Sequence, residues 1–99
     1  MANHKSAIKA HEQSLRRRDR NNRMKSRMRR AIRGTRSAIG AVGAQDEDSA
    51  SAARESIRTT AALIDKLAGK GVIHRNAAAR HKSRLDRRLR KASAPAQDS

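Results

Sequence analysis

The amino-acid sequence predicts an all-α protein, an antiparallel three-helix bundle whose long, basic first helix protrudes beyond the other two. Apolar residues recur at steps of three and four along three stretches of the chain, as they do on helices with one buried face. Glycines separate these stretches. The one pair of adjacent β-branched aliphatic residues, Val72 and Ile73, is too short to predict a strand. We expect a single domain over residues 1–92 and a flexible tail over residues 93–99.

The first helix is expected over about residues 6–42, because neither proline nor glycine interrupts residues 6–33. About 35 residues at ~1.5 Å each would span about 50 Å. Only the second half carries an apolar stripe; the first half contains just Ile8 and Leu15 and has no face to pack on protein. The stripe of the second half consists of Met24, Met28, Ala31, Ile32, Thr35, Ile39 and Val42.

The second helix is expected over residues 48–69. The acidic run Asp46-Glu47-Asp48 suits the positive end of a helix dipole, and either Asp48 or Ser49 is the expected N-cap. The sequence Gly69-Lys70-Gly71 is expected to end the helix. Its buried stripe would consist of Ala53, Ile57, Ala61, Ile64 and Leu67 or Ala68.

The third helix is expected over residues 75–91, capped by Asn76 or His74. Its apolar stripe is shorter than the other two and includes a polar position. The expected members are Ala78, His81 or Lys82, Leu85 and Leu89. Alanine, with 19 residues in the chain, would let the three helices approach closely.

The charge of the chain predicts a polyanionic partner. There are 25 basic residues against nine acidic ones, for a net charge of +16. Residues 1–37 have a net charge of +11, residues 38–69 of −2 and residues 70–99 of +7. Such self-repulsion opposes a compact state, and a polyanion would remove it while releasing counterions. Arginine supplies 18 of the basic residues, which favours bidentate contacts to phosphate.

The expected mode of recognition follows from what the chain lacks. Readers of single strands stack bases on Phe, Tyr or Trp, and the chain contains none of these. This leaves recognition of backbone and shape, suited to folded RNA or to coating DNA. The stretch from Arg16 to Arg23 has no apolar face to insert into a membrane surface. Polar groups that could contact 2′-hydroxyls are Asn3, Asn21, Asn22, Asn76 and Ser83.

Catalysis and metal binding are not expected. The chain has no cysteine, no G-x-S-x-G elbow and no phosphate-binding loop. No two of its four histidines are four residues apart, as in a helical metal pair. We therefore expect neither enzyme activity nor cofactor. No apolar stretch is long enough to span a membrane, and the basic, polar start predicts no signal peptide, so a cytoplasmic protein is expected.

Several short motifs follow one another along nearly the whole chain. They are Met1-Ala2-Asn3-His4-Lys5-Ser6-Ala7, Arg20-Asn21 with Lys25-Ser26 and Arg29, Ile64-Asp65-Lys66, Lys70-Gly71-Val72-Ile73-His74-Arg75-Asn76, Ala78-Ala79-Arg80 and Lys82-Ser83-Arg84-Leu85. In this order they resemble the bacterial small-subunit ribosomal protein family numbered twenty. The sequence departs from the family pattern at Ala10-His11-Glu12 and at Arg30.

The resemblance implies a three-helix bundle bound directly to 16S ribosomal RNA in the small (30S) subunit. It implies a structural role in subunit assembly and translation, as a monomer beside other small-subunit components and without a small-molecule substrate. A nucleoid-type protein that coats DNA is the alternative. Matching positions place rRNA contacts on His4, Lys5, Ser6, Lys9, Arg20, Asn21, Lys25, Ser26, Arg29, His74, Asn76, Arg80, Lys82, Ser83 and Arg84, and the basic run of the first helix adds Arg16, Arg17, Arg23 and Arg33.

Overall fold

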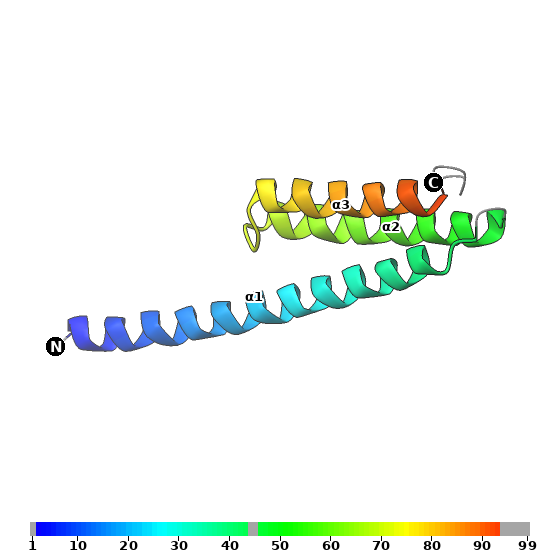
Figure 1. Cartoon of the computed structure of the whole chain (residues 1–99). Helices are drawn as coiled ribbons and strands as arrows, with labels where there is room; N and C mark the ends of the chain where they lie inside the picture. Colours follow the sequence, from blue (N-terminus) through cyan, green and yellow to red (C-terminus); the bar gives the residue numbers. More distant parts are fainter. Residues whose placement is uncertain (1, 44–45, 94–99) are drawn as a thin grey trace.

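The computed structural model describes residues 2–43 and 46–93, with side chains from His4 onward. These residues form three helices, α1 (Ala2–Gly40), α2 (Glu47–Gly69) and α3 (Arg75–Ser93), and no strand. Each helix packs against the other two. The chain reverses direction at each turn, so α1 runs parallel to α3 and antiparallel to α2 (Figure 1). The predicted all-α three-helix bundle is confirmed. The molecule measures 73 × 21 × 19 Å, because the N-terminal half of α1 extends past the other helices.

Helix α1 differs from the expected range 6–42 at both ends. It begins at Ala2, since the residues before Ser6 include no helix breaker, and its 39 residues span about 58 Å at ~1.5 Å each. It ends at Gly40, where the amide of Ala41 donates to the carbonyls of both Ser37 and Ala38 and tightens the last turn. The first half, residues 4–20, is exposed on all sides, as its sequence predicts.

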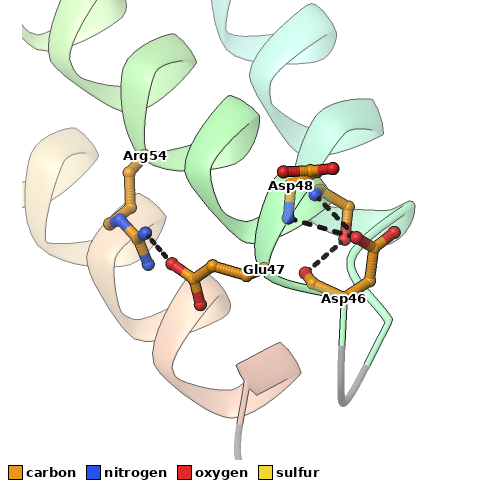
Figure 2. A network of polar contacts seen from close by, with 5 residues as sticks. Asp46, Glu47, Asp48 and Arg54 are labelled. Atoms are coloured by element: carbon orange, nitrogen blue, oxygen red, sulfur yellow. Dashed lines mark hydrogen bonds and ion pairs between the residues drawn. The ribbon is translucent and has the colours of Figure 1, made fainter.

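The N-cap of α2 is Asp46, and the prediction of Asp48 or Ser49 was wrong. Asp46 has an extended backbone, and its Oδ1 accepts from the amides of Asp48 at 3.1 Å and Ser49 at 3.3 Å (Figure 2). The two predicted caps are therefore the second and third helical residues, whose amides need a cap. The Ser49 hydroxyl instead donates to the Asp46 carbonyl and accepts from the amide of Gly43.

The turn between α2 and α3 lies where the glycines predicted it. Gly71 has φ +78°, a left-handed conformation that costs a side-chain-bearing residue about 1–2 kcal/mol. Its amide donates to the Ala68 carbonyl, and the amide of Val72 to the Leu67 carbonyl, which closes α2. Of the two alternatives for the cap of α3, His74 is correct. Its Nδ1 accepts from the amide of Asn76 at 3.0 Å.

The core lies where the three predicted stripes meet. From α1 it takes Met28, Ile32 and Ile39; the remaining buried apolar members are Ala53, Ile57, Ile64, Leu67, Ala78 and Leu85. Met24, Val42, Leu89 and the linker residues Val72 and Ile73 pack against this cluster and are partly buried. Helix α3 continues to Ser93, two residues past its expected end. The rest of the predicted tail, residues 94–99, lies outside the described residues.

A buried hydroxyl cluster crosses the contact between α1 and α2. Thr35 of α1 and Thr60 of α2 are 1% and 3% exposed, and their Oγ1 atoms are 2.6 Å apart. The Thr35 hydroxyl also lies 2.9 Å from the hydroxyl of Ser56. A buried hydroxyl without a partner costs about 1–3 kcal/mol, so sliding one helix along the other would carry that penalty. The cluster therefore fixes the register of α1 on α2.

Candidate nucleic-acid interface

Seven of the twelve exposed lysines and arginines of α1 lie on one side of the helix, and the other five, Arg17, Arg18, Arg29, Arg33 and Arg36, lie on its other sides. At 100° per residue, steps of three, four and seven return to the same face. Seven residues follow this rule from the first turn to the level of the bundle and form what we call the arm stripe: Lys5, Lys9, Arg16, Arg20, Arg23, Arg27 and Arg30. All seven are exposed, and none takes part in an ion pair among the described residues.

The other faces of the protruding half of α1 differ from the arm stripe. Ile8 and Leu15, 50% and 44% exposed, lie together on a neighbouring face. The two acids of this half, Glu12 and Asp19, lie between these apolar residues and the stripe. Arg17 lies about a quarter turn from the stripe, and Arg18 lies on the opposite side of the helix. The seven cations of the arm stripe therefore present a regular line of positive charge to a polyanion, and the exposed arginines on the other sides of α1 add to the overall attraction.

A shallow groove borders the arm stripe where α1 reaches the bundle. Asn22, Arg23, Ser26, Arg27 and Arg30 line this groove on the helix surface. The groove brings the predicted rRNA contacts Arg23 and Ser26 next to Arg27 and Arg30, which belong to the basic run of the first helix but are not among the predicted rRNA contacts. Their spacing could have identified them, because Arg20, Arg23, Arg27 and Arg30 follow the same three–four rule.

A second group of cations lies where α1 faces α3. Arg80 and Arg84 of α3 are exposed, and with Arg36 of α1 they surround the partly buried His81. Burial, and then the positive charges of Arg84, Arg80 and Arg36, lower the pKa of His81. These groups share the seam between two parallel helices.

The low pKa of His81 predicts how stability depends on pH. The folded protein disfavours the protonated imidazole, so the unfolded chain binds more protons once pH falls through the usual histidine pKa of about 6.5. The thermal midpoint of the wild type should therefore fall from pH 7.5 to pH 5.5. The thermal midpoint of His81→Gln should fall less. This variant keeps the carboxylate titration of the wild type but lacks the contribution of His81. Parallel curves for the two proteins would contradict this account.

The remaining predicted contacts are divided among several roles. Lys82 Nζ lies 2.8 Å from Asp65 Oδ1 of α2, so this cation already has an acidic partner. His74 uses Nδ1 to cap α3, which leaves Nε2 for an external ligand. Asn21 and Lys25 are partly buried where α1 enters the bundle. The exposed predicted residues are His4, Lys5, Ser6, Lys9, Arg16, Arg17, Arg20, Arg23, Ser26, Arg29, Arg33, His74, Asn76, Arg80, Ser83 and Arg84.

Helix α2 is electrostatically different from the other two. Arg54 Nη2 lies 2.6 Å from Glu47 Oε1 (Figure 2), and Arg58 Nη1 lies 3.3 Å from Glu55 Oε2. Such exposed pairs contribute only about 0–1 kcal/mol each to stability. Because glutamates of the same helix partly neutralise Arg54 and Arg58, the outer face of α2 attracts polyanions far less than α1 and α3 do.

The acidic run before α2 is explained by local structure. Asp46 caps the helix and Glu47 pairs with Arg54 (Figure 2). Over residues 2–43 and 46–93, no group of three His, Cys, Asp or Glu side chains could hold a metal ion. No helix in this part of the chain is long and apolar enough to cross a membrane.

Comparison with known proteins agrees with these observations. The family profile described as Ribosomal protein S20 matches residues 2–90. Small ribosomal subunit protein bS20 of Maridesulfovibrio salexigens is 44% identical over 91 residues, which cover 92% of this chain and 98% of that protein. The bS20 proteins of Nitratidesulfovibrio vulgaris strain Miyazaki F and of Nitrosospira multiformis are each 45% identical over 85 residues, 86% of this chain and 91% of theirs. The chain belongs to the ribosomal protein S20 family, as its motifs predicted.

Proposed function

We propose that this chain binds 16S rRNA directly, as a structural component of the small ribosomal subunit, and supports subunit assembly and translation. It would do so as a monomer beside other small-subunit components in the cytoplasm. The proposal involves no cofactor and no small-molecule substrate. The relatives that it matches are named small ribosomal subunit proteins, and their family is one of structural proteins and not of enzymes.

The arm stripe is the observation that carries this proposal. A helix whose first half is exposed on all sides gains nothing from packing on its own bundle, and a polar helix of that kind is marginal in isolation. Phosphates along an RNA groove would give it partners, with counterion release as the driving force. The predicted contacts from His4 to Arg23 would act in this way. Those from His74 to Arg84 would contact a second RNA surface at the bundle.

Competition binding and footprinting together test the proposal. Full-length protein is titrated against 16S rRNA and against duplex DNA of random sequence at the same salt concentration, and the rRNA is probed with hydroxyl radicals with and without protein. We expect tighter binding to rRNA and a confined set of protected nucleotides. Equal affinity for the two polymers, with diffuse protection, would instead support the alternative of a DNA-coating protein.

A further inference from the structure

A cleft lies at one end of the bundle, between the last turns of α1 and α3. Because these two helices are parallel, their C-terminal ends lie at the same end of the molecule (Figure 1). The cleft is lined by Arg36, Ile39, Gly40 and Val42 on one side and by Arg88, Lys91 and Ala92 on the other. It lies at the opposite end of α1 from the start of the arm stripe.

The lining combines three cations with an apolar floor. Ile39 is only 5% exposed, and Val42 and Ala92 are partly buried against the core. None of the described lining residues is acidic, and none of the three cations belongs to an ion pair in the described part of the chain. The C-terminal ends of α1 and α3 each supply about half a negative charge, together too little to offset three positive ones. A low-dielectric wall beside the cations strengthens their field toward the cleft.

The positive charge continues from the cleft along α3. Residues Arg80, Arg84, Arg88 and Lys91 follow each other at steps of four, four and three and so lie on one side of the helix. Arg36 belongs to the same field, since its charge acts on His81 together with those of Arg80 and Arg84. One turn of helix is about 5.4 Å, so this side presents regularly spaced cations, as suits a chain of regularly spaced anions.

We propose that the cleft formed by Arg36, Arg88 and Lys91 binds the phosphates of an RNA strand, as a backbone-binding site separate from the arm stripe. All three residues belong to basic stretches of the sequence that predict nucleic-acid binding, but none is among the individual rRNA contacts predicted above. Two guanidinium groups from different helices can each bind a phosphate with two parallel hydrogen bonds, and the ammonium of Lys91 adds a third donor group. This site rests on the proposed function, because it needs rRNA as the polyanion.

A matched pair of triple variants tests the site in the full-length protein. The cleft variant carries Arg36→Gln, Arg88→Gln and Lys91→Gln. The control carries Arg54→Gln, Arg58→Gln and Lys66→Gln on α2, so that both lose three positive charges. Circular dichroism melts check that both remain folded. Affinity for 16S rRNA is then measured from 50 to 300 mM salt, a range that covers strong and weak binding.

The two variants should differ in their salt dependence. Each phosphate contact contributes roughly 0.7–0.9 to the slope of log affinity against log salt. The cleft variant should therefore lose about two from the slope, and on the order of tenfold in affinity at moderate salt, while the control loses less than one. Equal slopes for the two variants would overturn the cleft site alone. Failure of the wild type to prefer rRNA would overturn the proposed function.

A tethered cleavage reagent gives an independent readout. The chain has no cysteine, so a single introduced thiol is unique. A side chain at Gly40, which lines the cleft, would meet nothing within 4 Å. An iron chelate on Gly40→Cys should cut bound 16S rRNA at a confined set of nucleotides. The same chelate on Ala62→Cys, on the exposed face of α2, should cut weakly. Comparable cleavage from the two positions would contradict the cleft site.

Discussion

Replacing Ile64 with Ala is expected to lower the free energy of unfolding by about 3–4 kcal/mol and to leave a large fraction of the protein unfolded at 37 °C. Ile64 is fully buried near the centre of the core. Truncating a buried isoleucine removes its transfer free energy and leaves a cavity, at a cost of about 2–5 kcal/mol. The total free energy of unfolding of a small domain is only about 5–15 kcal/mol. Urea unfolding followed by circular dichroism measures the change.

The thinness of the core makes this effect large. Ten apolar residues are buried in the described structure, three of them are alanine, and the chain has no aromatic residue to enlarge the set. Ile8→Ala is the matched control, because Ile8 is 50% exposed on the arm. It should change the free energy of unfolding by less than about 0.5 kcal/mol. Similar losses in the two variants would mean that Ile64 does not lie in the main core.

The fold was predictable because its stripes are periodic. Each of Met28, Ile32, Ala53, Ile64, Ala78 and Leu85 is buried where a period of 3.6 residues placed it. The N-cap of α2 was not predictable in the same way. Three consecutive acids compete for that position, and Asp46 has it because the turn gives this residue an extended backbone. A cap depends on the path of the preceding turn, which periodicity does not describe.

The buried hydroxyl cluster escaped prediction for a related reason. Thr35 belonged to the expected stripe of α1, but Thr60 interrupts that of α2 and reads as a polar residue on an apolar face. It is tolerated because Thr35 lies 2.6 Å away on another helix. The sequence thus contained both residues but not the contact that makes either of them acceptable in the core.

The candidate site, too, is predictable from sequence only where its residues lie on one helix. Local spacing identifies the arm stripe, since all of its members belong to one helix. The cleft depends on Arg36 of α1 and on Arg88 and Lys91 of α3, which are far apart in the sequence and meet only because α1 and α3 are parallel neighbours. A cation in a basic segment can be recognised from sequence as available for phosphate. Its partners in a shared site come from the packing of the helices.

Neutralising the centre of the arm stripe is expected to reduce affinity for 16S rRNA on the order of a hundredfold at moderate salt. The variant carries Arg16→Gln, Arg20→Gln and Arg23→Gln, three exposed cations on one face of α1. Loss of up to three phosphate contacts should lower the salt slope by about two to three. The thermal midpoint should stay the same, because these side chains contribute nothing to the core. Filter binding over a salt series and a thermal melt measure both effects.

The same positions changed to lysine separate charge from geometry. Lysine keeps the positive charge but cannot form the bidentate contact of arginine. If backbone charge dominates, the lysine variant should retain nearly the wild-type salt slope while losing some affinity, and its footprint on the rRNA should keep its position. If the glutamine variant binds as well as the α2 control triple, the arm stripe is not the interface.

A variant that combines the arm and cleft substitutions tests whether the two sites act independently. The arm has no contact with the cleft. If both sites bind the same RNA independently, their effects on log affinity should therefore add.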